Sequence, residues 1–107
     1  MSVTLTVSNE IAQQLEGLSF GEPSGVDEKL QNLLKAEYQR RLARHRSTDR
    51  QLTDKYNMDF ACFAKHQMTR RYGFTWEVES DARVWEAAVD GIQTLQEQLA
   101  HLQTKTV

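Results

Sequence analysis

The chain has 107 residues, of which 39% are hydrophobic and 26% charged, and its formal net charge at pH 7 is −2. This length is typical of one small domain with a thin hydrophobic core, so pairing with a second copy is an expected source of stability. No apolar run is long enough to span a membrane, the start "MSVTLTVSNE" lacks signal-peptide features, and a single cysteine excludes an internal disulfide framework. We therefore expect a cytoplasmic protein that does not contact the membrane.

Charged residues are distributed unevenly along the chain. Residues 1–36 hold two basic and five acidic residues, for a net charge of −3. Residues 37–71 hold nine basic and four acidic residues (+5), and residues 72–107 hold two basic and six acidic residues (−4). A basic middle between acidic ends favours electrostatic contacts with a partner or between copies of the chain, although solvated helix faces would have the same composition.

The first predicted element is a short β-strand in "SVTLTVS". Val3, Leu5 and Val7 alternate with serine and threonine, so the strand has one apolar face and one hydroxyl face. Ser8 is a suitable N-cap for the short amphipathic helix that follows. The apolar residues of that helix recur at helical spacing and are Ile11, Leu15 and Leu18.

A longer helix is predicted after the turn "FGEPSG", from Val26 onward. Its apolar residues are Leu30, Leu33, Leu34, Tyr38 and Leu42, and its far end is rich in arginine. At "HRSTD" this helix either bends or gives way to a new one that starts at Ser47 or Thr48. Asn57 is a plausible left-handed stop, and Asp59 can cap a third helical piece. That piece carries Phe60, Phe63, Ala64 and Met68 on one side, and "RRYGF" after it is a predicted loop.

The C-terminal third predicts an acidic strand and then a long helix. "TWEVES" alternates in polarity, which indicates a short strand at residues 76–79. From Ser80 to about Thr104, apolar residues recur at spacings of three and four: Trp85, Ala88, Ile92, Leu95, Leu99 and Leu102. This heptad seam predicts pairing with a helix of the same chain, of a second copy or of a partner protein. The predicted fold class is mainly α, with a short N-terminal β-strand followed by helices and a long C-terminal helix.

The residues that usually carry catalysis or bind metals form no convincing motif. The five glycines match no nucleotide-binding pattern, and no nucleophile has an obvious base. Cys62 and His66 are four residues apart, which is at most half of a metal site, and a buried thiol beside a surface imidazole is the simpler interpretation. Glu77, Glu79 and Asp81 could bind a hard cation, but a solvated acidic strand is the simpler alternative. We expect no enzymatic activity, no cofactor and no metal.

Residues 2 to about 46 resemble a ribbon-helix-helix unit, with the strand "VTLTV", a short helix, a Gly/Pro/Ser turn and a longer helix. Such units are halves of a dimer whose paired strands lie in the DNA major groove. By position, the resemblance implies that Thr4 and Thr6 read bases and that Ser24 contacts a phosphate. The strand has no Arg, Lys, Gln or Asn, and the first 36 residues are net acidic, which opposes DNA binding.

A second resemblance lies in "DKYNMDFACF" and "FTWEVESDARVWEAAV". Both segments resemble a pattern of small cyanobacterial and archaeal proteins that look like antitoxins of toxin–antitoxin pairs. The pattern is Lys-Tyr-Gly-Met-x-Phe, then Trp-Glu-Val-Glu, then a final helix. The matching residues are Lys55, Tyr56, Met58, Phe60, Trp76, Glu77, Val78, Glu79, Trp85 and Glu86, with Asn57 in the glycine position.

This second resemblance implies that Trp76, Glu77, Glu79 and Trp85 bind a partner. Tryptophan offers a large rigid contact, and carboxylates steer it to a basic surface such as the cleft of an RNA-cleaving toxin. The alternative is that both tryptophans anchor the last helix on the protein's own core.

The expected organisation is a dimerisation region at 1–46 and a helical partner-binding region at 47–107. The expected function is neutralisation of a co-encoded toxin by a homodimer, with repression of its own operon as an additional role. The alternative is a helical adaptor or assembly subunit that binds no nucleic acid.

Overall fold

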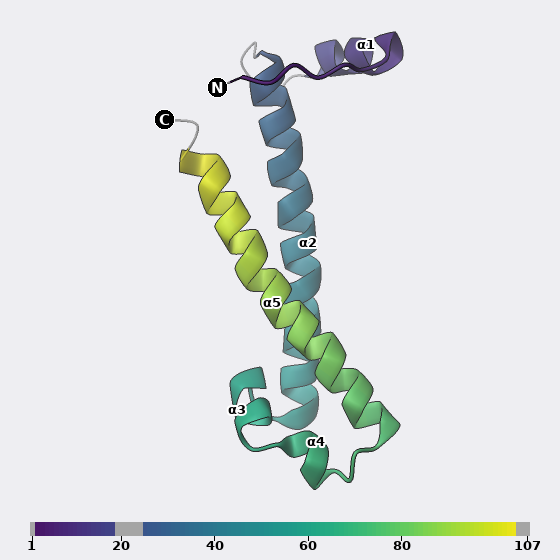
Figure 1. Cartoon of the computed structure of the whole chain (residues 1–107), viewed down its shortest axis with the longest axis vertical. Coiled ribbons are helices and arrows are strands. Elements are labelled where there is room, and N and C mark those ends of the chain that lie inside the picture. Colours follow the sequence, from purple (N-terminus) through teal and green to yellow (C-terminus); the bar gives the residue numbers. More distant parts are fainter. Residues whose placement is uncertain (1, 19–24, 105–107) are drawn as a thin grey trace. The chain divides into compact units, whose positions relative to one another are not determined.

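The computed structural model describes residues 2–18 and 25–104, which form five α-helices and no β-strand (Figure 1). The helices are α1 (Asn9–Gly17), α2 (Val26–Tyr56), α3 (Phe60–Lys65), α4 (Met68–Arg71) and α5 (Trp76–Thr104). The predicted mainly α fold class is therefore confirmed. The chain divides into two compact units, Met1–Ala36 and Glu37–Val107. The functional division at residues 1–46 and 47–107 stays a prediction.

The first unit contains α1 and the first turns of α2. The side chain of Ser8 accepts a hydrogen bond from the backbone N–H of Ile11 at 3.2 Å, which confirms the predicted N-cap. The ammonium group of Lys29 donates to the carbonyl oxygen of Glu16 at 3.2 Å, which connects α2 to the end of α1. Residues 2–8 are not in a strand in this single chain. A strand requires a second strand for its backbone hydrogen bonds, and no other described segment supplies one.

In the second unit, α2 continues through "HRSTD" without a break. The hydroxyl of Thr48 donates to the carbonyl of Arg44 at 3.2 Å, which satisfies this polar side chain inside the helix. A new helix at Ser47 or Thr48 is therefore excluded. α2 ends as predicted, because Asn57 has a left-handed φ of 56°. The side chain of Asp59 then caps α3 by accepting from the N–H of Cys62 at 2.8 Å.

The predicted strand at residues 76–79 is wrong, because these residues form the first turn of α5. The hydroxyl oxygen of Thr75 accepts from the N–H of Val78 at 3.4 Å, and its carbonyl accepts from the N–H of Glu79 at 3.0 Å. Thr75 thus starts the helix, and the carboxylates in the first turn are favourable at the positive end of the helix dipole. The apolar residues of this stretch fit a helix as well as a strand, since Val78 leads to Ala82 and Trp85 along one face.

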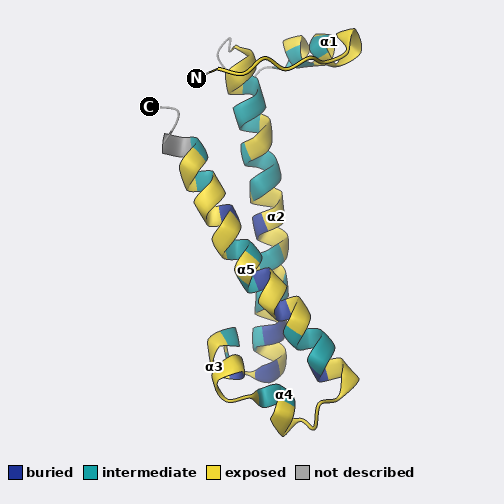
Figure 2. Ribbon diagram, in the orientation of Figure 1, coloured by how far each residue is buried: buried dark blue, intermediate teal, exposed yellow. Residues whose placement is uncertain are grey.

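The core of the second unit lies between α2 and α5, with α3 and α4 closing one end (Figure 1). The buried side chains are Leu42, Leu52, Tyr56, Phe63, Val78, Trp85, Ala88 and Leu95 (Figure 2). Every residue of the predicted heptad seam is buried or half-buried. The seam therefore packs on the chain's own α2. In the described part of the chain, no helix combines the length and the apolar character that crossing a membrane requires.

Candidate functional site

Several motif residues of the second resemblance meet where α2 ends and α5 begins. Trp85 is fully buried, and its ring lies 5.8 Å from that of Tyr56, in a stacked arrangement with an interplanar angle of 18°. The rings of Phe60 and Phe63 lie 5.4 and 5.1 Å from Trp85. The indole N–H of Trp85 donates to the carboxylate of Asp49 at 2.8 Å, so its polar atom is satisfied. The interpretation of Trp85 as a core anchor is confirmed, and in this conformation it has no exposed surface for a partner.

A polar network joins the same two helices beside this aromatic cluster. The ammonium of Lys55 lies 2.7 Å from a carboxylate oxygen of Glu77 and 2.6 Å from one of Asp81. The hydroxyl of Tyr56 donates to the same Asp81 oxygen at 2.6 Å. We call Lys55, Tyr56, Glu77 and Asp81 the joint network. It pairs residues at the end of α2 with the first two turns of α5, so it determines where α5 begins relative to α2.

The joint network changes the acidity of its members. Burial and the hydrogen bond to Asp81 raise the pKa of Tyr56 to about 12. Partial burial of Asp81 acts to raise its pKa, but the hydrogen bonds from Lys55 and Tyr56 outweigh burial and hold that pKa below its usual value. The hydrogen bonds that Lys55 donates, to Asp81 first and then to Glu77, raise the pKa of Lys55. Asp81 is thus ionised and Lys55 protonated at neutral pH, so the network includes an ion pair between α2 and α5.

The other predicted partner-binding residues lie at the surface. The side chain of Trp76 is 78% exposed at the first position of α5. Glu77 is exposed but paired with Lys55, and Glu79 is half-buried. Two aromatic residues that the sequence analysis did not identify, Tyr72 and Phe74, are also exposed. Their place beside a glycine in "RRYGF" was the available signal, because a glycine-containing loop presents its neighbours to solvent.

The predicted DNA-contacting residues belong to the first unit. Thr4 and Thr6 are exposed, as are the apolar residues that alternate with them, while Ser24 lies outside the described residues. Nothing in their geometry distinguishes base readers from solvated threonines. Their role stays a prediction.

The candidate metal ligands do not form a site in the described segments. Across residues 2–18 and 25–104, no three His, Cys, Asp or Glu side chains lie close enough to bind one metal ion. Cys62 is exposed, so the expectation of a buried thiol is wrong. The reason is that Phe63, the next residue, occupies the inward face of the short α3 helix.

Comparison with known proteins does not assign the chain to a family. No protein-family model matches it, and no curated protein or solved structure is significantly similar to it.

Proposed function

We propose that the chain is the antitoxin of a toxin–antitoxin pair, and that it acts as a homodimer which neutralises a co-encoded toxin by binding it. The observation that supports association with another protein is that the first unit has no buried side chain among its described residues. Val3, Leu5 and Val7 are 86%, 71% and 47% exposed, although they lie on one face of an alternating segment. An apolar face of this kind is stabilised when another protein covers it.

A second copy of the chain is the proposed cover for this face. Two alternating segments can pair antiparallel as strands, and each then supplies the backbone hydrogen bonds that the other lacks. Further exposed apolar residues of the same unit extend the surface that a second copy would bury, and they are Ile11, Val26, Leu33 and Leu34. In this arrangement the hydroxyl face, with Thr4 and Thr6, points away from the dimer and contacts operator DNA.

The proposed toxin-binding surface is the start of α5. The exposed indole of Trp76 supplies a large apolar contact, and Glu77 and Glu79 beside it favour a basic surface on the toxin. Lys55 compensates part of this negative charge but also holds the first turn of α5 in place. A surface held in one geometry loses less conformational entropy when it binds.

A growth-rescue experiment tests the proposal. The small gene next to this one is expressed alone and together with the full chain; the first culture should stop growing and the second should grow. Trp76→Ala should abolish the rescue, whereas Val84→Ala should preserve it, because Val84 is 52% exposed and lies about two turns further along the same helix. A neighbouring product that binds the chain but does not arrest growth would favour the adaptor function instead.

The DNA-binding part of the proposal has a separate test. Thr6→Ala should weaken operator binding by about 1–3 kcal/mol, which is the usual scale for removing one base-specific interaction. Electrophoretic mobility shift at several salt concentrations measures this. Unchanged operator affinity in the variant would exclude the strand from DNA recognition, without affecting the test for toxin binding.

A further inference from the structure

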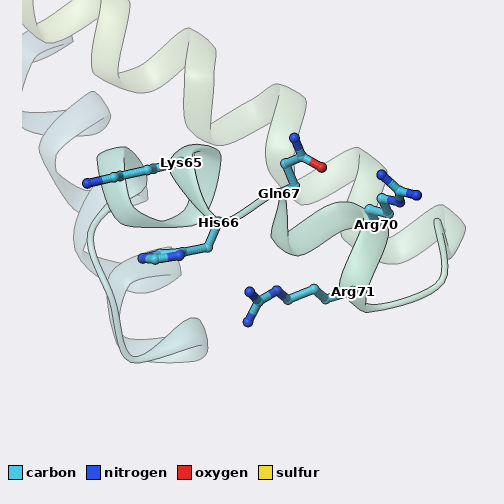
Figure 3. A pocket seen from close by; sticks show the side chains of 5 residues that line it. All are labelled: Lys65, His66, Gln67, Arg70 and Arg71. Atoms are coloured by element: carbon cyan, nitrogen blue, oxygen red, sulfur yellow. The ribbon is translucent and has the colours of Figure 1, made fainter.

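A concave basic surface lies at the turn between α3 and α4. It encloses about 520 Å³ and is formed by Lys65, His66, Gln67, Arg70 and Arg71, which we call the basic turn (Figure 3). In Figure 3 the side chains of Lys65, His66 and Arg71 all extend to the left, whereas Gln67 points upward and Arg70 points up and to the right, away from them. No carboxylate is among the lining residues. The surface is therefore suited to an anion.

The cations of the basic turn differ in their pairing from Lys55 and from the arginines around Glu37. Arg40 and Arg41 share the carboxylate of Glu37, at 2.8 and 3.2 Å. Lys55 is paired with the carboxylates of the joint network. Among the described residues, no carboxylate lies within ion-pair distance of Lys65, Arg70 or Arg71. Three charges on one short segment thus repel one another, and an external anion would relieve this repulsion.

The loop that follows the basic turn is hydrogen-bonded to α4 and carries an exposed aromatic residue. The backbone N–H of Gly73 donates to the carbonyl oxygen of Arg70, and that of Phe74 to the carbonyl oxygen of Thr69, both at 3.0 Å. The loop therefore folds back on α4. Gly73 and Phe74 both have left-handed backbone conformations, with φ of 75° and 54°. This conformation is rare for a bulky residue and is held here by the hydrogen bonds. The Phe74 side chain does not enter the core and is 57% exposed, three residues after Arg71 in the chain.

We infer that the basic turn and Phe74 together bind single-stranded nucleic acid. Lys65, Arg70 and Arg71 contact phosphates of a strand that passes around the turn, and a base stacks on the ring of Phe74. Guanidinium groups match phosphate geometry, and an exposed aromatic ring in the following loop can stack on an unpaired base, which a duplex does not offer. This site is distinct from the proposed operator contacts in the first unit and from the proposed toxin contacts of α5.

Fluorescence anisotropy of the full chain with a labelled oligothymidylate tests the inference. Binding should weaken with salt, and Arg70→Ala with Arg71→Ala should lower the slope of log affinity against log salt by roughly 1.4, about 0.7 for each phosphate that is no longer neutralised. Arg40→Ala with Arg41→Ala is the matched control, because it removes the same charge from paired arginines and should leave the slope almost unchanged. Phe74→Ala should weaken binding about tenfold, and Phe74→Tyr, which keeps a ring in the same backbone, should restore it.

Three results would overturn the inference. One is an unchanged salt slope in the Arg70/Arg71 double variant, with circular dichroism showing that the variant is folded. Another is equal affinity for a duplex of the same length, which would remove the base contact. The third is equally strong displacement by polyglutamate, which would reveal a general acidic-protein surface. Thr4→Ala with Thr6→Ala should leave oligothymidylate binding unchanged, so that failure here and failure of operator binding are distinguishable.

Discussion

Tyr56 connects the end of α2 to the start of α5 with both parts of its side chain. Its ring stacks on Trp85 and contacts Phe63 edge-on at 5.0 Å, while its hydroxyl donates to Asp81. The apolar and polar contacts of this one residue therefore hold the same two helix ends together. Their separate contributions can be measured because the hydroxyl can be removed without changing the ring.

We expect Tyr56→Phe to lower the free energy of unfolding by about 1–2 kcal/mol. The hydrogen bond is made to a charged group, but the site is partly exposed, which reduces the contribution of this bond to stability. Urea unfolding measures the change. Tyr72→Phe is the matched control, because Tyr72 contacts Tyr56 through its ring and its hydroxyl makes no hydrogen bond to a described residue; it should change stability by less than about 0.5 kcal/mol.

Asp81 makes the stability depend on pH in the acid range. Its pKa is lower in the folded chain than in the unfolded chain, so its stabilising effect is complete above about pH 4 and is lost as the pH falls through the folded value. Unfolding curves between neutral pH and about pH 3 should show this loss. Asp81→Asn should flatten the dependence but not abolish it, because hydrogen bonds from Arg40 and Arg41 also lower the pKa of Glu37. An identical pH dependence in wild type and Asp81→Asn would contradict this role.

At the scale of elements, a glycine sets how closely α5 approaches α2. A Cβ atom added at Gly91 would lie 2.7 Å from Cδ2 and Nε2 of His45, so a larger residue would force the imidazole to move. Glycine inside a helix normally costs about 1 kcal/mol relative to alanine. Its presence in the middle of α5 is therefore explained by the contact with His45.

The effect of Gly91→Ala on stability should depend on the residue at position 45. In the wild-type chain the imidazole must move to make room for the added methyl, which offsets the gain in helix propensity. In a His45→Ala background the methyl has room, and the same change should stabilise the chain by up to about 1 kcal/mol. A double-mutant cycle from urea unfolding measures the coupling. Effects of the same sign and size in both backgrounds would show that the helices do not approach at these residues.

The heptad seam of α5 is internal, so its truncation should affect the free protein. Leu95 is buried, and Leu95→Ala should lower the free energy of unfolding by roughly 2–5 kcal/mol. Thermal or urea unfolding measures the loss, and the exposed Val84→Ala on the same helix provides the control. A melting curve unchanged by Leu95→Ala would indicate that the seam serves a partner instead.

The whole molecule consists of a second unit with a core and a first unit without one in its described residues. The buried side chains of the described chain all lie between Leu42 and Leu95, and the exposed apolar residues of the first unit have no internal cover there. Association of two copies through the first unit would remove these apolar residues from water. The proposed dimer is therefore a property of the complete chain and not of the α2–α5 pair.

Sedimentation equilibrium should show a dimer at about tens of micromolar protein. Val3→Ser with Leu5→Ser should give a monomer whose second unit still unfolds cooperatively, because these residues lie outside its core. Thr4→Ala, on the opposite face of the segment, should leave the dimer intact. A wild-type chain that stays monomeric at this concentration would exclude pairing through residues 3–7.

Local features were predictable from the sequence because they depend on residues only a few positions apart. The Ser8 and Asp59 caps and the left-handed stop at Asn57 each involve one turn of backbone, and side-chain chemistry alone identifies them. The spacing of the α5 seam likewise indicated a helix with a helical partner. Only tertiary structure decided that this partner is α2, since a seam pattern contains no information about which helix covers it.

The joint network and the basic turn could be identified only in the tertiary structure, and for a different reason. Lys55 meets Glu77 and Asp81 across 22 and 26 residues, and no local pattern pairs them. "TWEVES" satisfies both a strand and a helix pattern over so few residues, and its helix is decided by the Thr75 cap and by the packing of Val78 in the core. Whether Arg70 and Arg71 form ion pairs depends on which carboxylates the fold brings near them. The composition could therefore show a basic middle region, but not which of its cations have no carboxylate partner.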